Sequence, residues 1–221
     1  MTDLVPGRAR WGSMGEHPLL SLLLEAAAGS FPPVDGQAQF LPPLGSGLEA
    51  VVSFTGRAYL VTAMLPEAFA DLHPDGYGAA LAPAVLQRLA GHGEIGVLDV
   101  ILVSRGTGGN RLPARADLDD HPRVLHARSL RQQVRVFGDE RGVVTVASGL
   151  AGRTELSVQT WPDRHGTGRG LIQDALSLVP AGAPVFAAVA PGNARSLRAF
   201  VALGFQALGS EVLIRPQRHR C

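Results

Sequence analysis

Three strand-length patterns follow one another closely between Val134 and Thr160, and the connections between them are too short to hold a helix. The patterns cover residues 134–137, 143–150 and 154–160 and are joined by short glycine-containing turns. Parallel neighbours need a crossover of about a dozen residues or more, so connections this short join antiparallel neighbours. The sequence therefore predicts an antiparallel meander.

Helices and strands alternate before and after this meander. The residue patterns predict helices over 17–28, 83–90, 123–132, 169–178 and 194–203, and strands over 37–41, 48–54, 58–63, 96–103, 185–189 and 207–214. The apolar run over 96–103 is continuous and rich in β-branched residues, which is typical of a buried strand. Helices that alternate with strands pack on the faces of a sheet. We therefore predict an α/β fold with a mixed, mostly antiparallel sheet flanked by helices, preceded by an α+β extension.

Composition narrows the classes of function. The chain has 20 basic and 19 acidic residues and a net charge of +1, which does not mark a nucleic-acid or anionic-membrane binder. Hydrophobic residues make up 46% of the chain, which argues against disorder. Every basic residue is arginine. The lack of lysine excludes Schiff-base enzymes, kinases and Walker-type phosphate loops, because each needs a lysine ammonium group.

The cysteine content and the lengths of the apolar runs indicate the cellular compartment in which the protein is expected. The single cysteine, Cys221, excludes an internal disulfide framework and a cysteine-based zinc cluster. The apolar run from Leu19 to Leu24 is far shorter than the ~20 residues that span a bilayer. The histidines lack partners at metal-ligand spacing. We expect a cytoplasmic protein without a metal ion or a membrane anchor.

A glycine-rich loop, His165-Gly-Thr-Gly-Arg-Gly170, lies between a predicted strand and a predicted helix. Glycines let consecutive N–H groups point into one concavity, and the following helix adds the positive end of its dipole. Such a loop can hold phosphate oxygens without a lysine, although a plain strand-to-helix turn has the same composition. A Rossmann dinucleotide site fits less well, because its third glycine has a different spacing.

Two motifs together resemble those of the GNAT superfamily of acyl-CoA-dependent N-acetyltransferases. The pyrophosphate loop of that family reads Gln/Arg-x-x-Gly-x-Gly/Ala, and the loop described above matches it except at His165. Downstream, Asn193 opens a predicted helix, Phe200 follows within it, and Gly204-Phe205 closes the segment, as in the second signature of the family. The order of strands and helices also agrees.

The resemblance divides the chain at residue 92. Residues 93–221 resemble a GNAT-like acetyltransferase domain, and residues 1–92 form an extension that the resemblance does not explain. A second glycine-rich segment over 104–110 echoes the loop at 165–170. The extension is therefore either an unrelated addition or a degenerate second GNAT-like half.

The resemblance also implies where acetyl-CoA would bind. The strand that ends at Thr160 and the strand that begins at Val185 would diverge, and the pantetheine arm would lie between them. The arm would bond to the backbone of Val158, Gln159, Thr160 and Trp161, and the pyrophosphate to His165, Gly166, Thr167, Gly168, Arg169 and Gly170. Asn193 would contact the arm, cap its helix, or do both.

Proton transfer is the step on which this sequence departs from the family. Many members use a tyrosine as the acid at the position of Phe200, and phenylalanine has no proton to donate. For the base, the resemblance favours Glu155, near the start of the strand over 154–160. Glu211, on the last strand, is a second candidate. Glu155 fits equally well as a strand carboxylate paired with an arginine.

The function expected from the sequence is transfer of an acetyl group from acetyl-CoA to a primary amine of a small molecule or protein, by direct attack in a ternary complex. The partners would be acetyl-CoA and the amine acceptor, with no nucleic acid and no membrane. A homodimer through the extension is left open. Because of Phe200, so is a second function: a catalytically reduced acyl-CoA-binding or regulatory module on the same fold.

Overall fold

The computed structural model describes residues 16–218, so Cys221 lies outside the described part of the chain. Its helices are α1 (Pro18–Ala27), α2 (Pro83–Ala90), α3 (Pro122–Leu130), α4 (Gly168–Leu176) and α5 (Ala194–Val201). Its strands are β1 (Ala38–Leu41), β2 (Glu49–Phe54), β3 (Arg57–Val61), β4 (Glu94–Arg105), β5 (Gln132–Asp139), β6 (Gly142–Ser148), β7 (Thr154–Thr160), β8 (Pro184–Val189) and β9 (Gln206–Arg215). Every predicted helix and strand is present, with ends within two residues of the prediction.

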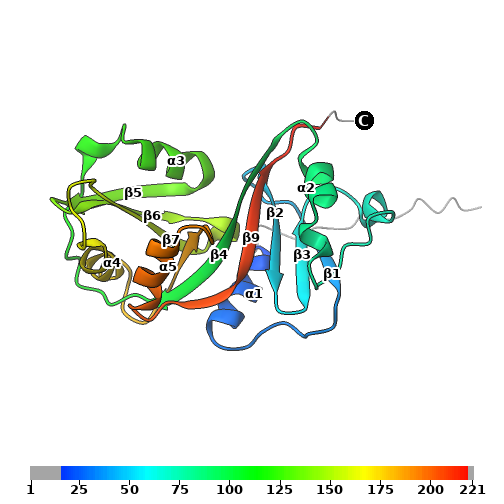
Figure 1. Ribbon diagram of the computed structural model, residues 1–221, viewed down its shortest axis with the longest axis horizontal. Helices are drawn as coiled ribbons and strands as arrows, with labels where there is room; N and C mark the ends of the chain where they lie inside the picture. The colour runs from blue at the N-terminus through cyan, green and yellow to red at the C-terminus, as the bar shows by residue number, and fades with distance from the viewer. Residues whose placement is uncertain (1–15, 219–221) are drawn as a thin grey trace, which may run out of the picture.

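The strands described here form one nine-stranded sheet in the order β1-β3-β2-β9-β4-β8-β7-β6-β5 (Figure 1). Only the β1–β3 and β7–β8 pairs are parallel. The predicted fold class, a mixed and mostly antiparallel sheet flanked by helices, is confirmed, and β5, β6 and β7 form the predicted meander. β9 pairs with both β2 and β4, so residues before and after position 92 share the sheet.

Adjacent residues of β4 show how the helices cover the two faces, because side chains alternate along a strand. Leu102 packs in a core cluster with residues of α4 and α5, whereas Ile101 and Val103 pack in a cluster with Leu19 and Leu23 of α1. α3 lies on the α1 face, and α2 covers the α4 face at the other end of the sheet. No helix of the described residues is long and apolar enough to cross a membrane.

The first half of β4 differs from the prediction of a buried strand. Ile101, Leu102 and Val103 are buried, but Val97 is 66% exposed and Leu98 is 40% exposed. The pairing of β4 with β9 is interrupted by a register shift in this half. The two strands continue as a long twisted ribbon beyond the neighbouring strand β8 (Figure 1). This half of β4 is exposed because it borders an open cavity instead of a packed core.

Candidate functional site

The sheet opens between its two parallel central strands. β7 and β8 pair at one position only, Glu155 opposite Phe186, and they diverge beyond it. A cavity of about 620 Å³ occupies this opening and reaches residues on both faces of the sheet. Asn193 and Phe200 line it from α5, and Arg123 lines it from α3. The divergence that the resemblance implied is therefore present, and it creates the main cavity described here.

Trp161, at the end of β7, has no free backbone group to offer a ligand. Its amide donates to the carbonyl of Arg141 (3.0 Å), and its carbonyl accepts from the amide of Arg164 (3.0 Å). Its indole N–H donates to the carbonyl of Asp139 (3.3 Å). Trp161 therefore holds the end of the strand in place.

The register of β7 then decides which other backbone groups are free. Hydrogen-bonded and non-hydrogen-bonded pairs alternate along an antiparallel ladder. Because the Trp161 amide bonds to Arg141, the residue directly before β6, the alternation makes Gln159, which lies opposite Val143, turn its backbone groups to β6. Val158 and Thr160 turn theirs toward the opening. Of the four positions expected to bond the pantetheine arm, these two are suited to it.

The loop between β7 and α4 carries amides without acceptors. Within the described residues, the N–H groups of Gly166, Gly168 and Arg169 have no hydrogen-bond partner. Gly166 has a φ of 84°, a conformation that favours glycine. α4 begins at Gly168, so the positive end of its dipole faces this loop. The exposed side chains of His165 and Arg169 flank these donors, and the whole set suits anionic oxygens.

The other two residues of the loop, Thr167 and Gly170, lie close to other parts of the protein. The Thr167 hydroxyl donates to the carbonyl of Arg164 (2.8 Å), which closes the turn before α4. A Cβ atom at Gly170 would lie 3.1 Å from the Arg141 guanidinium, so a side chain there would press on that arginine. Arg141 in turn is ion-paired with Asp139 and Asp174.

Asn193 caps its helix, which is one of the two roles considered for it. Its side-chain oxygen accepts a hydrogen bond from the amide of Ser196 (3.1 Å), so it caps α5. It also lines the cavity, and its side-chain nitrogen has no partner among the described residues. Phe200, two turns further along, lines the cavity as well and packs edge-to-face on Phe205, with 4.8 Å between ring centroids.

A buried cluster of charges lies beside the cavity. The side chain of Arg153 is 0% exposed and donates to Glu211 at 2.6 and 2.7 Å and to Glu155 at 2.9 and 3.1 Å. Arg131 donates to the other oxygen of Glu155 at 2.6 Å. The two candidate bases are 56 residues apart in sequence, and Arg153 brings them together, since it bonds to both.

Both glutamates are therefore engaged in ion pairs. Burial alone would raise the pKa of Glu155, but Arg153 and Arg131 outweigh it and hold that pKa below its usual value. For Glu211 burial prevails, and its pKa lies above the usual value despite Arg153. A carboxylate with every oxygen held by guanidinium groups is a poor proton acceptor, because accepting a proton would break these bonds. Glu155 is the poorer proton acceptor of the two, because it bonds to two arginines and its pKa is lowered, whereas the pKa of Glu211 is raised.

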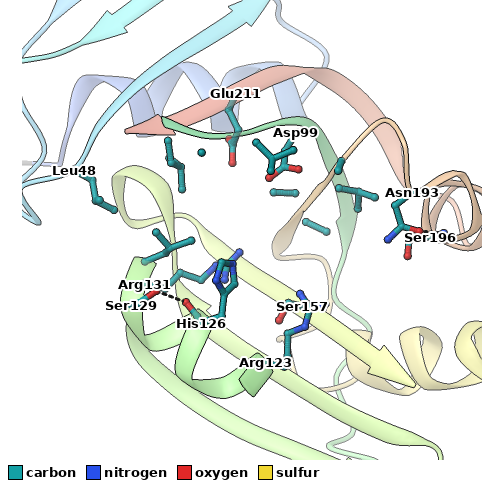
Figure 2. Close-up of a pocket in the computed structure, with 18 of the residues that line it drawn as sticks. Leu48, Asp99, Arg123, His126, Ser129, Arg131, Ser157, Asn193, Ser196 and Glu211 are labelled. Atoms are coloured by element: carbon teal, nitrogen blue, oxygen red, sulfur yellow. Dashed lines mark hydrogen bonds between the residues drawn. The ribbon is translucent and has the colours of Figure 1, made fainter. Parts of the chain in front are cut away.

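A third carboxyl group, Asp99, faces the same cavity and was missed by the sequence reasoning. It lies on β4 directly opposite Glu211, and both side chains project into the cavity (Figure 2). Asp99 is half-buried and has no hydrogen-bond or ion-pair partner within the described residues. Burial raises its pKa to about 6, with further contributions from the charges of Glu211 and Glu155. Two arginines thus serve three carboxyl groups, and Asp99 is the one left over.

Basic side chains of α3 line the opposite wall (Figure 2). Arg123 is half-buried and donates through Nε to the side chain of Gln159 (3.3 Å). Its pKa is lowered by burial and then by Arg131. The pKa of His126 is lowered by burial and by the neighbouring arginines, so its imidazole is neutral at pH 7. The cavity therefore has an acidic wall on β4 and β9 and a basic wall on α3.

Comparisons with known proteins give distant likenesses in structure. No family model matches the sequence, and a search of curated proteins found no significant match. A solved structure from Novosphingobium aromaticivorans, assigned to the GNAT family of acetyltransferases, is similar with a TM-score of 0.40 and 15% identity over 56% of this chain and 66% of that chain. A conserved protein of unknown function from Staphylococcus epidermidis is similar with a TM-score of 0.38 and 13% identity over 62% of this chain and 68% of that chain. Both TM-scores lie below 0.5, so a function for this chain has to rest on the geometry of its own site.

Proposed function

We propose that this protein is an acyltransferase that moves an acetyl group from acetyl-CoA to a primary amine, with Asp99 as the base. One observation carries this proposal. A carboxyl group with a pKa of about 6, and without a cationic partner in the described part of the chain, faces the cavity between the diverging strands β7 and β8. Glu155 and Glu211, by contrast, already bond to arginines.

The chemistry of the transfer explains why such a group is needed. An amine with a pKa near 10 reaches the site as an ammonium ion and has to lose a proton before its nitrogen can attack. A base works best when its pKa lies near the working pH. Asp99 is ionised at pH 7, so its carboxylate attracts the ammonium ion and accepts its proton.

The residues around the opening suit acetyl-CoA, which would supply the thioester carbonyl that the amine attacks. Val158 and Thr160 offer backbone groups along the opening. The amides of Gly166, Gly168 and Arg169 offer donors for phosphate oxygens. The side-chain nitrogen of Asn193 remains free to contact a ligand.

Phe200 keeps the second proposal open, that of a catalytically reduced acyl-CoA-binding module. Under the first proposal the thiolate leaves without a side-chain acid at that position. A thiol has a pKa of about 8.5, so its anion is a tolerable leaving group near neutral pH. Under the second proposal, acetyl-CoA would bind but no amine would be acetylated.

We further propose that residues 1–92 form an extension that supports the cavity from outside the transferase part. β2 pairs with β9 and so buttresses the strand that carries Glu211. Leu48, directly before β2, lines the cavity itself. The extension would thereby complete the wall on the acceptor side.

Calorimetry with acetyl-CoA tests the first requirement of these proposals. Gly168→Glu places a carboxylate among the proposed phosphate donors, at a position where a Cβ atom meets nothing closer than 3.6 Å. Gly45→Glu is the matched control, because a Cβ there has open space and the position lies in a different loop. We expect the wild type and the control to bind and Gly168→Glu to lose at least about tenfold in affinity, the usual scale of one charge-assisted contact.

Release of free CoA in the presence of a panel of amines then separates the two functions. Amine-dependent CoA release would support the transferase. Binding of acetyl-CoA without release for any amine would support the binding module. Equal binding by wild type and Gly168→Glu would contradict the proposed phosphate site.

A further inference from the structure

The walls of the cavity carry opposite charges, and among the residues that the structure describes, each wall has one charged group without a partner of opposite sign. On the β4–β9 wall this group is Asp99. On the α3 wall it is Arg123, whose only side-chain hydrogen bond to another described residue runs from Nε to the neutral Gln159. The other two arginines of the lining are engaged, Arg131 with Glu155 and Arg215 with Glu94.

Both groups are half-buried, so their unpaired state is costly. Burial disfavours the charged form of each, and a buried charge without a counter-charge weakens a fold. Charges of this kind are kept where a ligand supplies the missing partner. One ligand that spans the cavity could supply both, because Asp99 and Arg123 face the same space from opposite walls (Figure 2).

The free part of Arg123 indicates what that ligand carries. Its two terminal nitrogens, Nη1 and Nη2, have no partner within the described residues. These nitrogens form the planar fork that binds a carboxylate through two parallel hydrogen bonds. The lining of the same cavity also includes the apolar residues Ile95, Val97 and Leu213.

We propose that the acceptor is an amino carboxylate, with its amine at Asp99, its carboxylate at Arg123 and its carbon skeleton against the apolar lining. This inference rests on the proposed transferase function and adds the class of acceptor to it.

An alternative role for Arg123 is to bind a phosphate of acetyl-CoA, and the position of the residue argues against it. Arg123 contacts Gln159 on the α3 face of the sheet. The amides proposed for the pyrophosphate belong to the start of α4, which packs on the opposite face. The two sets of anion donors therefore lie on different sides of β7.

Binding measurements on matched ligands test the inference directly. The first set is L-leucine, L-leucinamide, in which an uncharged amide replaces the carboxylate, and 4-methylpentanoate, which lacks the amine. The second set is 6-aminohexanoate, 6-aminohexanamide and hexanoate, in which the charged groups are further apart. Each ligand is titrated by calorimetry into the full chain saturated with CoA, for the wild type, Arg123→Gln, Asp99→Asn and Arg128→Gln.

Arg128→Gln is the control for loss of a positive charge from α3, since Arg128 is ion-paired with Asp119 and does not line the cavity. Arg123→Lys is the conservative variant, and a thermal melt checks that each variant is folded. A lysine keeps the charge but loses the planar fork, so it should recover only part of the preference for a carboxylate.

We expect at least one amino carboxylate to bind about tenfold or more tightly than both its amide and its amine-free analogue, as charge-assisted hydrogen bonds of this kind predict. Arg123→Gln should abolish the preference over the amide. Asp99→Asn should abolish the preference over the amine-free acid. Arg128→Gln should keep both preferences.

Three results would overturn the inference: equal binding of the amides, a preference that survives Arg123→Gln, or no binding by any amino carboxylate. Acetylation assays on the same ligands distinguish failure of the proposed acceptor class from failure of the proposed transferase function. Acetylation of amines that lack a carboxylate, with no preference for amino carboxylates, would support the transferase and reject its proposed acceptor class. Binding of amino carboxylates without acetylation would reject the transferase and keep the ligand class.

Discussion

Asp99 and Glu211 lie directly opposite each other on neighbouring strands, yet only Glu211 is bonded to an arginine. Arg153 is fully occupied by Glu211 and Glu155, so Asp99 bonds to no guanidinium group from residues 16–218. The same ion pairs that neutralise two buried carboxylates thus leave the third one free for a ligand. Under the proposed function, the charge cluster supports the site and Asp99 is its reactive member.

Replacing Asp99 with asparagine should remove the base without changing the shape of the site. We expect kcat/KM for the amine to fall about 100-fold or more, within the usual range for a general base, while the affinity for acetyl-CoA stays the same. The wild-type rate should rise as the pH increases through about 6, where Asp99 loses its proton, and Asp99→Asn should lack this rise. Steady-state kinetics between pH 5 and 9 measure both.

The control for this variant is Asp71→Asn, which removes a surface carboxylate paired with Arg88. The competing base is His126, which also faces the cavity and is neutral at pH 7. If His126→Gln abolished the rise in rate and Asp99→Asn kept it, the base would be the histidine.

Asp99→Asn should also make the protein more stable, with a gain in stability that begins above about pH 4 and is complete above about pH 6. The pKa of Asp99 is about 6 in the folded state, above its usual value, so the folded chain holds a proton that the unfolded chain releases. The ionised carboxylate therefore costs stability above pH 6, and the protonated group costs none below pH 4. Because Asp99 is only half-buried and solvent screens its charge, we expect a gain of about 1 kcal/mol at pH 8. Denaturant melts at pH 8 and pH 4 measure it.

If Asp99→Asn is more stable than the wild type at pH 8 but not at pH 4, the ionised carboxylate of Asp99 destabilises the fold, as is common for active-site groups. A loss of stability at pH 8 would mean that the ionised group has a stabilising partner in solution. Asp71→Asn again provides the baseline, since its carboxylate is exposed and paired with Arg88.

The sheet and its helices were predictable because each element carries its own local pattern. The β5–β7 meander follows from turns too short for any other connection, and the amphipathic spacing of α4 and α5 is visible in their sequences. The glycine-rich loop and Asn193 could also be found, because their conformations need those residue types. In these parts of the chain, local sequence decides the structure.

The chemistry of the site was less predictable, because it depends on contacts between distant strands. Asp99 stands alone in an apolar run, and that run was interpreted as a buried strand. A single carboxylate within such a run is the signal that could have identified it. Arg153 lies in a turn and gives no sign of being buried; its bond to Glu211 exists because β9 enters the sheet beside β4. The sequence of a single strand does not contain that adjacency.

The variants Glu155→Gln and Arg153→Met should affect stability more than chemistry. The pKa of Glu155 is held below its usual value, so its charge stabilises the fold above about pH 4.3, the ordinary glutamate pKa, and this contribution is lost as the pH falls through the folded-state value. Arg153→Met leaves two buried carboxylates without their shared cation, and we expect it to cost about 3–5 kcal/mol. Denaturant melts at pH 7 test both variants.

Kinetics on the folded fraction of Glu155→Gln separate a structural role from a catalytic one. We expect its kcat to stay within about tenfold of the wild type, because the loss of a supporting ion pair shifts the site less than the loss of the base. If kcat fell 100-fold while the melting curve stayed unchanged, Glu155 would be the base and Asp99 would not. Asp117→Asn, which breaks a surface pair with Arg115, controls for the loss of one carboxylate.

Restoring a tyrosine at Phe200 tests whether the missing acid limits the reaction. The ring lines the cavity and packs edge-to-face on Phe205, so Phe200→Tyr adds a hydroxyl next to the site, whereas Phe205→Tyr adds one to the partner ring that does not line the cavity. Because a thiol pKa of about 8.5 makes the thiolate a tolerable leaving group, we expect Phe200→Tyr to change the rate of CoA release by less than about threefold at pH 8. An increase of tenfold or more, absent in Phe205→Tyr, would instead show that the chain is a transferase slowed by the loss of its acid.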